Sequence, residues 1–229
     1  MNFRAAVVGI RRGVDPGFFP EAMEAAFAAG LEALEVTMNT NGAEGIIGRS
    51  RPSVPRGRLL GMGTVRSVEE AERAVAAGAM FLVTPNTDRA VIEYSRSAGV
   101  PVIAGALTPT EVQAAWSAGA SMVKVFPCGA LGGPRYLAAL KGPFDGIPMM
   151  PVGGVGLSNL EEYFRAGASA VGVGTSLFGR DALEEKNAVK LERNVRHFVG
   201  HCPVRPAGNG HDITHSKGEG NVQTGNQGH

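Results

Sequence analysis

Five amphipathic, helix-like segments of this chain end in the pair Ala-Gly, and an apolar run follows each pair. The five pairs are Ala29-Gly30, Ala77-Gly78, Ala98-Gly99, Ala118-Gly119 and Ala166-Gly167. Glycine directly after a helix readily takes the left-handed conformation that ends it. The pairs are about 20 residues apart, or about twice that where one is missing, and a helix, a strand and two short loops need roughly that length. The spacing therefore predicts a repeated βα unit.

The apolar runs and the amphipathic segments alternate along most of the chain. The candidate strands cover residues 5–10, 33–38, 59–63, 80–84, 100–104, 121–126, 148–152 and 170–174. The candidate helices cover residues 18–29, 68–77, 88–97, 109–117, 135–140, 159–166 and 184–199. The segment 42–55 has a weak pattern, and we expect it to be mostly loop.

Eight strands that are apolar on both faces, alternating with helices, favour a parallel sheet covered by helices. We therefore predict an α/β fold, a (β/α)8 barrel of the TIM type, as one domain over residues 1–202. An open, doubly wound sheet is the alternative, but the first candidate helix does not open with Gly-x-Gly-x-x-Gly. Residues 203–229 are of low complexity, and we expect a disordered tail.

Composition and charge argue against several classes of protein. The formal net charge is +1 with acidic and basic residues interspersed, so we expect neither nucleic acid nor a membrane surface as a partner. No apolar stretch reaches the length of a membrane span, and the first residues lack a signal-peptide cleavage site. Cys128 and Cys202 show neither a disulfide framework nor metal-ligand spacing. We expect a cytoplasmic protein without metal or other cofactor.

The positions of histidine restrict the chemistry. All five are near the end of the chain, at His197, His201, His211, His215 and His229. A metal site in this last segment is an alternative to a disordered tail. An active site within residues 1–190 must move its protons with Lys, Glu or Asp instead of imidazole.

Lys124 lies in the apolar run 121–126, which has the pattern of a strand buried on both faces. Lysine is rarely buried unless it is paired or used, because desolvation disfavours its charged form. Burial lowers the pKa of the ammonium and so supplies a free amine that can attack a carbonyl carbon. A structural ion pair, or a side chain that reaches solvent at the strand end, is the alternative. The other lysines (Lys141, Lys186, Lys190 and Lys217) lie in contexts typical of solvated side chains.

Glu35 lies in a second apolar strand and alternates onto the same face as Ala33 and Thr37, as a barrel-interior residue would. An inward lysine and an inward glutamate near strand ends, without histidine, favour a nucleophile and its proton shuttle. A structural Lys-Glu pair remains the alternative.

Glycine-rich loops follow the last two candidate strands. They contain Gly153, Gly154, Gly174 and Ser176, and their backbone N–H groups are well placed for phosphate in a barrel of this type. Arg12 and Thr64 follow the first and third strands and could each hold a carboxylate. Alternatively, Arg12 is a solvated loop charge beside Arg11, and Thr64 is a helix cap or a hydroxyl bonded to backbone.

Seven motifs together resemble the 2-keto-3-deoxy-6-phosphogluconate aldolase family, which also includes 4-hydroxy-2-oxoglutarate and phosphogalactonate aldolases. They are Leu34-Glu35-Val36-Thr37, Gly61-x-Gly63-Thr64-Val65, Val83-Thr84-Pro85-Asn86, Gly105-x-x-Thr108-Pro109-x-Glu111, Val123-Lys124-Val125-Phe126-Pro127, Lys141-Gly142-Pro143-Phe144 and Pro151-Val152-Gly153-Gly154-Val155. Each motif is weak alone, but their order and spacing over roughly residues 5–200 are specific.

The resemblance implies that Lys124 forms the Schiff base and that Glu35 is the acid/base. It further implies a homotrimer of (β/α)8 barrels without metal. Our own hypothesis from the strand-end positions is that Thr64 and Arg12 anchor the carboxylate of a phosphorylated 2-keto acid that yields pyruvate, with Arg12 the candidate if Asn39 does not hold it. In this hypothesis Pro85 and Phe126 shape the apolar pocket around pyruvate.

Two positions depart from the phosphogluconate pattern. Asn39 stands where many such members have Arg, and Val152 stands where they have Thr before the paired glycines. Both resemble the phosphogalactonate enzymes, and Val152 cannot hydrogen-bond the substrate C4 hydroxyl. The expected reaction is cleavage of 2-keto-3-deoxy-6-phosphogluconate. A possible second substrate is 4-hydroxy-2-oxoglutarate. The alternatives are the galactonate reaction, a non-catalytic phosphosugar-binding or scaffold barrel, and a phosphosugar epimerase or synthase.

Overall fold

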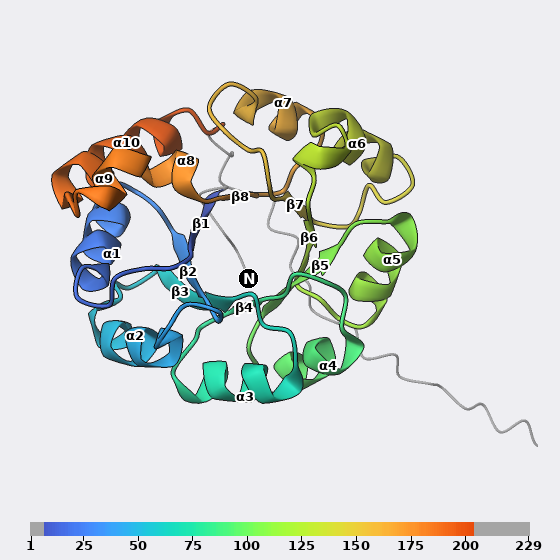
Figure 1. Ribbon diagram of the computed structural model, residues 1–229. Coiled ribbons are helices and arrows are strands. Elements are labelled where there is room, and N and C mark those ends of the chain that lie inside the picture. The colour runs from blue at the N-terminus through green and yellow to red at the C-terminus, as the bar shows by residue number, and fades with distance from the viewer. Residues whose placement is uncertain (1–6, 204–229) are drawn as a thin grey trace, which may run out of the picture.

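The computed structural model describes residues 7–203, and these form a barrel of eight parallel strands surrounded by helices (Figure 1). The strands are β1 (Val7–Arg11), β2 (Ala33–Thr37), β3 (Leu59–Gly63), β4 (Leu82–Val83), β5 (Val102–Ala106), β6 (Met122–Val125), β7 (Met149–Pro151) and β8 (Val171–Val173). Their order in the sheet is β7-β6-β5-β4-β3-β2-β1-β8. The predicted (β/α)8 barrel is confirmed, and the doubly wound alternative is wrong.

The two ends of this order meet, which closes the sheet on itself. Between β7 and β8 the contact is one parallel bridge, Val152 with Gly172, and a hydrogen bond of 2.8 Å from Ser169 N–H to Met149 C=O. The other neighbouring strands pair directly, for example β2 with β3 over five residues. The seam between β7 and β8 is therefore held by fewer backbone contacts than the β1–β2 or β2–β3 ladders.

Helices follow the strands and cover the outside of the barrel (Figure 1). The longer ones are α1 (Phe19–Ala28), α2 (Ala43–Ser50), α3 (Val68–Ala76), α4 (Arg89–Ser97), α5 (Pro109–Ser117), α6 (Pro134–Lys141), α7 (Leu160–Arg165) and α10 (Ala188–Gly200). Shorter ones are α8 (Thr175–Phe178), α9 (Arg180–Glu184) and the 3-10 turns η1 (Arg51–Ser53) and η2 (Gly129–Leu131). The five glycines of the Ala-Gly pairs all have positive φ directly after a helix, as the sequence predicted.

The segment 42–55 corrects the sequence analysis. It was expected to be mostly loop, but it contains α2 and η1. Ala43, Ile46, Ile47 and Ser50 are all buried, which is the i, i+3, i+4, i+7 face of an amphipathic helix. Burial of this face outweighs the low helix propensity of Gly45 and Gly48. The helix expected over 184–199 is α10, which begins at Ala188 and ends at Gly200, and the short helices α8 and α9 before it were not foreseen.

Two apolar layers hold the fold together. Inside the barrel lies a cluster of Val8, Ala33, Phe81, Val83, Ile103, Met122, Met150, Val152 and Ala170. A larger cluster packs the outer faces of the strands against the helices. Because strand side chains alternate between the two layers, strands such as β1, β2 and β5 contribute to both. The inner cluster forms the apolar floor beneath the carboxyl ends of the strands.

Several expectations depend on residues outside the described range. The strand expected over residues 5–10 is confirmed from Val7 onward, while the start of the chain, Lys217, His211, His215 and His229 are not described. The division into a barrel over 1–202 and a tail over 203–229 stays a prediction. Within residues 7–203, no helix has the length and hydrophobicity needed to span a bilayer.

Candidate active site

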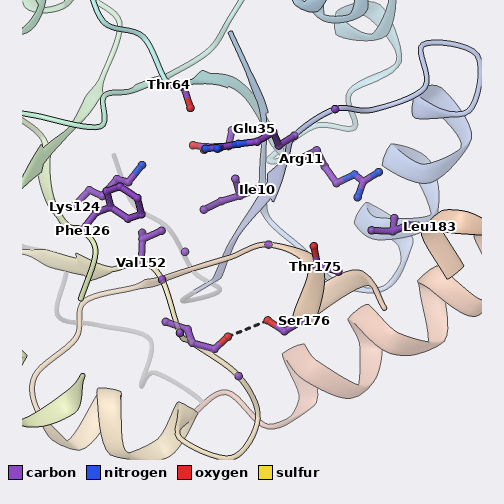
Figure 2. A pocket seen from close by; sticks show the side chains of 18 of the residues that line it. Ile10, Arg11, Glu35, Thr64, Lys124, Phe126, Val152, Thr175, Ser176 and Leu183 are labelled. Atoms are coloured by element: carbon purple, nitrogen blue, oxygen red, sulfur yellow. Dashed lines mark hydrogen bonds between the residues drawn. The ribbon is translucent and has the colours of Figure 1, made fainter. Parts of the chain in front are cut away.

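A cavity of about 880 Å³ opens at the carboxyl ends of the strands (Figure 2). All eleven residues singled out from the sequence line it: Arg12, Glu35, Thr64, Pro85, Lys124, Phe126, Val152, Gly153, Gly154, Gly174 and Ser176. They come from loops and strand ends spread over most of the barrel. The structure therefore brings together residues that lie more than 160 positions apart in the chain.

Lys124 lies near the end of β6, with only 5% of its surface exposed. Its Nζ atom lies 4.9 Å from the centroid of the Phe126 ring. Desolvation by burial lowers the pKa of the Lys124 ammonium, an effect that nearby Glu35 opposes and nearby Arg12 reinforces. A larger share of the side chain is therefore the neutral amine than for a solvated lysine.

Glu35 lies on β2, on the opposite wall of the barrel from Lys124, and is 1% exposed. Desolvation raises its pKa from 4.5 to about 7, although the charges of Lys124 and Arg12 act in the opposite direction. Its Oε2 atom is buried and has no hydrogen-bond partner among the described residues. A carboxyl group with a pKa near neutrality can both give and take a proton at physiological pH.

Gly63 provides the space that the Glu35 carboxyl occupies. A Cβ atom built on Gly63 would lie 2.3 Å from Oε1 and 3.0 Å from Oε2 of Glu35. Both distances are too short for real contacts. The end of β3 must therefore lack a side chain for the carboxyl to lie where it does.

Lys124 and Glu35 reach into the same cavity from opposite walls (Figure 2). No ion pair within 4.0 Å joins them in the described part of the chain. The structural ion pair considered as an alternative is thus not formed. The space between the amine and the carboxyl is open to a small molecule.

Thr64 has a backbone conformation that is unusual for its residue type. Its φ is 56°, in the left-handed region that β-branched residues rarely adopt. The residues on either side are fixed by hydrogen bonds from Met38 N–H to Gly63 C=O (2.7 Å) and from Val65 N–H to Val83 C=O (3.1 Å). Strain of this kind is concentrated at functional sites.

The loops next to the pocket are held by their own hydrogen bonds. Gly13 N–H donates to Thr40 Oγ1 at 3.0 Å, which ties the Arg12 loop to the end of β2. Thr84 Oγ1 donates to Asn86 C=O at 2.7 Å and accepts from Gly105 N–H at 2.9 Å, which fixes the loop carrying Pro85. Asn39 is exposed and does not line the cavity.

The glycine loops after β7 and β8 form another part of the wall. Gly153 and Gly154 both have positive φ, at 91° and 76°, and Gly129 N–H donates to Gly153 C=O at 3.0 Å. After β8, Gly174 precedes the first turn of α8, and Ser176 Oγ donates to Val155 C=O at 2.9 Å. This bond couples the two loops directly (Figure 2).

The other described lysines differ from Lys124. Lys186 and Lys190 form exposed ion pairs with Asp15 and Glu185. Lys141 was expected to be solvated, but it is half-buried, and its Nζ donates to the carbonyls of Asp145 (2.6 Å) and Ile147 (3.0 Å). Desolvation also lowers the pKa of Lys141, yet its donors are used by the backbone and it does not line the cavity.

Sequence reasoning missed part of the cavity. Arg11, Gly13, Asp15, Phe18, Thr175, Leu183 and Glu184 line its outer end. Arg11 could have been noticed from the sequence, because a charged residue next to inward-facing Ile10 must point into the apolar layer between strands and helices.

Metal ligation has no support in the described residues. Within the range 7–203, no group of three or more His, Cys, Asp or Glu side chains is arranged to hold a metal ion. Cys128 and Cys202 are free thiols. A buried amine and a buried carboxyl at the mouth of a parallel barrel are instead the groups that class I aldolases use.

Comparisons with known proteins agree with this class. The family model described as KDPG and KHG aldolase matches residues 14–194. The chain therefore belongs to the KDPG and KHG aldolase family, whose members are class I aldolases.

The relatives include enzymes for two sugar acids. The chain is 40% identical over 139 residues to "2-dehydro-3-deoxy-phosphogluconate aldolase" of Treponema pallidum, a match covering 61% of this chain and 66% of that protein. It is 33% identical over 194 residues to "2-dehydro-3-deoxy-6-phosphogalactonate aldolase" of Escherichia coli, which covers 84% of this chain and 94% of that protein.

A solved structure of KDPG aldolase from Legionella pneumophila, with pyruvate captured as a covalent carbinolamine intermediate, superposes with a TM-score of 0.79. The two chains are 27% identical, and the match covers 85% of this chain and 94% of that one. The aldolase resemblance seen in the sequence is confirmed.

Proposed function

We propose that the protein cleaves 2-keto-3-deoxy-6-phosphogluconate into pyruvate and glyceraldehyde 3-phosphate through a Schiff base on Lys124. The observation that carries this proposal is the pair of buried groups, Lys124 and Glu35, which face one open cavity without forming an ion pair. The amine is the nucleophile, and the carboxyl has a pKa suited to moving protons in both directions.

The reaction begins when the neutral amine of Lys124 attacks the C2 ketone of the substrate. Glu35, directly or through a water molecule, protonates the C2 hydroxyl of the resulting carbinolamine, which leaves as water and gives an iminium ion. The iminium withdraws electrons from C3 and stabilises carbanion character there.

Glu35 then takes the proton of the C4 hydroxyl, the C3–C4 bond breaks, and glyceraldehyde 3-phosphate leaves as the aldehyde. The remaining enamine is protonated at C3, and water hydrolyses the pyruvate iminium to pyruvate and free Lys124. Protons and electrons balance without an added cofactor.

The other residues of the cavity bind the substrate in this proposal. Arg12 and Thr64 hold the C1 carboxylate near Glu35. Pro85 and Phe126 shape the apolar pocket around the pyruvate half. The backbone around Gly153, Gly154, Gly174 and Ser176 holds the phosphate at the first turn of α8 and the loop after β7.

Borohydride trapping tests the nucleophile. Incubation with pyruvate and sodium borohydride should add one reduced pyruvyl group at Lys124, located by peptide mass spectrometry. Lys141 is the internal control, because burial also lowers the pKa of its ammonium while its Nζ is occupied by carbonyls. Labelling of Lys141 with Lys124 unmodified would refute the assignment.

A second candidate substrate is the C4 epimer, 2-keto-3-deoxy-6-phosphogalactonate. Val152 favours it, since Val152 lines the cavity and offers no hydroxyl to orient O4. The E. coli relative with this printed activity supports it as well. Measuring kcat/KM for both epimers side by side, with 4-hydroxy-2-oxoglutarate as an unphosphorylated third substrate, decides among the three.

The same trapping experiment separates the remaining alternatives. A scaffold barrel that only binds phosphorylated ligands forms no reducible adduct, and neither does a sugar phosphate epimerase or synthase. The homotrimer and the cytoplasmic location stay predictions. Size-exclusion chromatography with light scattering at micromolar concentration would reveal a trimer, and a monomer would contradict that expectation.

A further inference from the structure

Arg11 is a buried cation without an acidic partner among the described residues. It is the last residue of β1 and is 9% exposed. Its Nε atom is buried and has no hydrogen-bond partner among the described residues. Arg11 also belongs to none of the ion pairs found within residues 7–203. Desolvation lowers the pKa of its guanidinium to about 10. A guanidinium removed from water in this way is costly unless something negatively charged binds to it.

The strand register places Arg11 beside the loop after β8. Gly9 pairs with Val173 in the β1–β8 ladder, so Arg11, two residues further, lies level with Thr175 at the start of α8. The guanidinium carbon lies 5.0 Å from the centroid of the Phe178 ring, which belongs to α8. The side chain therefore packs on the helix whose first turn borders the cavity.

Arg11 lines the outer end of the same cavity that contains Lys124. Figure 2 shows its side chain directed away from Lys124, toward Leu183 and the region of Thr175. The acidic residues at this end are Asp15 and Glu184. Asp15 is already bound by Lys186 at 2.7 Å and by the N–H groups of Gly17 and Phe18, and Glu184 is exposed. No acidic side chain between residues 7 and 203 therefore serves as a counter-ion for the guanidinium.

We propose that Arg11 binds the distal phosphate of the substrate, directly and as a forked donor, at the outer end of the cavity. This inference rests on the proposed function, because it assigns a further residue to the phosphate end of that substrate. The planar guanidinium matches two phosphate oxygens, as a lysine ammonium does not. Arg11 thus distinguishes phosphorylated from unphosphorylated 2-keto acids, while Arg12, at the other end, holds the carboxylate that both share.

The alternative is a purely structural role, in which Arg11 only packs on Phe178. The test compares two substrates in the full-length protein: the phosphorylated sugar acid and unphosphorylated 4-hydroxy-2-oxoglutarate. Arg11→Met keeps a long side chain over Phe178 and removes the charge. We expect KM for the phosphorylated substrate to rise by about tenfold or more, with kcat/KM for 4-hydroxy-2-oxoglutarate and pyruvate trapping at Lys124 unchanged.

Two further variants make the outcome decisive. Arg11→Lys keeps the charge and most of the volume, so it should fold if Arg11→Met does not, and should lose part of the phosphate preference. Arg12→Met should weaken both substrates together, since both carry the carboxylate. A direct measurement is the thermal shift with inorganic phosphate, which should raise Tm of the wild type but not of Arg11→Met.

Equal effects on the two substrates, or an unchanged phosphate-induced shift in both Arg11 variants, would overturn the proposal. Absence of a pyruvate adduct in the wild type would instead refute the proposed function. The two failures are therefore distinguishable.

Discussion

The substitution Gly63→Ala offers a sharp test of the active-site geometry, because it moves one carboxyl group without removing any. The new Cβ would lie 2.3 Å from Glu35 Oε1, whereas real Cβ contacts are at least 3.0 Å and ordinarily 3.4 Å or more. The Glu35 carboxyl must therefore shift by about 0.7 to 1.1 Å. A misplacement of about 1 Å can lower the rate of a catalysed step by about a hundredfold. We expect kcat for aldol cleavage to fall by that order.

The cost to folding can be worked out in the same way. Overpacking a buried site costs about 1–3 kcal/mol, and Ala recovers about 0.5–1 kcal/mol because it has less backbone freedom than Gly in the unfolded chain. The net loss of about 0–2.5 kcal/mol should lower Tm by several degrees in a chain of this length. Gly63→Ala should thus remain folded at 25 °C.

The assay measures pyruvate release under saturating substrate, together with circular dichroism melting. Gly9→Ala is the matched control: its Cβ would press on Leu31 and Phe178 at 2.9 Å, away from Glu35. It should lower Tm in a similar way but retain kcat. Borohydride should still trap pyruvate on Lys124 in both variants. Wild-type kcat in a folded Gly63→Ala protein would show that the position of Glu35 does not limit the reaction.

Three further predictions concern the same site. Lys124→Met should abolish the pyruvate adduct without lowering Tm, because a buried amine is replaced by an apolar side chain of similar length. The control Lys141→Met should keep the adduct. It should lower the free energy of unfolding by about 1–3 kcal/mol, since three carbonyls lose their donor. The profile of kcat/KM against pH should fall on the alkaline side near pH 7, where the Glu35 carboxyl loses the proton that it gives to the carbinolamine. Glu35→Gln should remove that limb and lower kcat by roughly a hundredfold, and an identical alkaline limb in both proteins would contradict this assignment. In the wild type the raised pKa means that the contribution of Glu35 to stability is full below pH 4.5 and is lost as the pH rises through about 7. Thr64→Gly should raise Tm or leave it unchanged, because glycine accepts the φ of 56° without strain worth about 1–3 kcal/mol, and should raise KM for pyruvate. Thr64→Ala, which loses the hydroxyl but keeps the strain, should be the less stable of the two, and the reverse order of Tm would refute the strain argument.

The sequence was sufficient for the barrel and for the positions of Lys124 and Glu35. Both lie in apolar runs with a two-residue alternation, and this period alone indicates which side chains face the barrel interior. Arg11 was missed because only the inward face of each strand end was considered, whereas Arg11 points outward and reaches the cavity from behind β1.

Other features depend on tertiary contacts that local patterns do not report. The helix α2 was missed because two glycines weaken its propensity, while burial of Ile46 and Ile47 stabilises it. The left-handed backbone of Thr64 is imposed by neighbouring strands and is opposed by its own residue type. Lys141 was expected to be solvated because its carbonyl partners come from the following loop, which only the folded structure places around it.

The seam between β7 and β8 has a consequence for ligand binding. The two strands share a single backbone bridge, and the loops that follow them are joined by the Ser176 hydrogen bond. An anion held by both loops would link two neighbouring strands that share few backbone contacts. Saturation with a phosphorylated ligand would then slow amide hydrogen exchange along β7 and β8 more than elsewhere. Phosphate binding would thereby stabilise the closure of the barrel between β7 and β8.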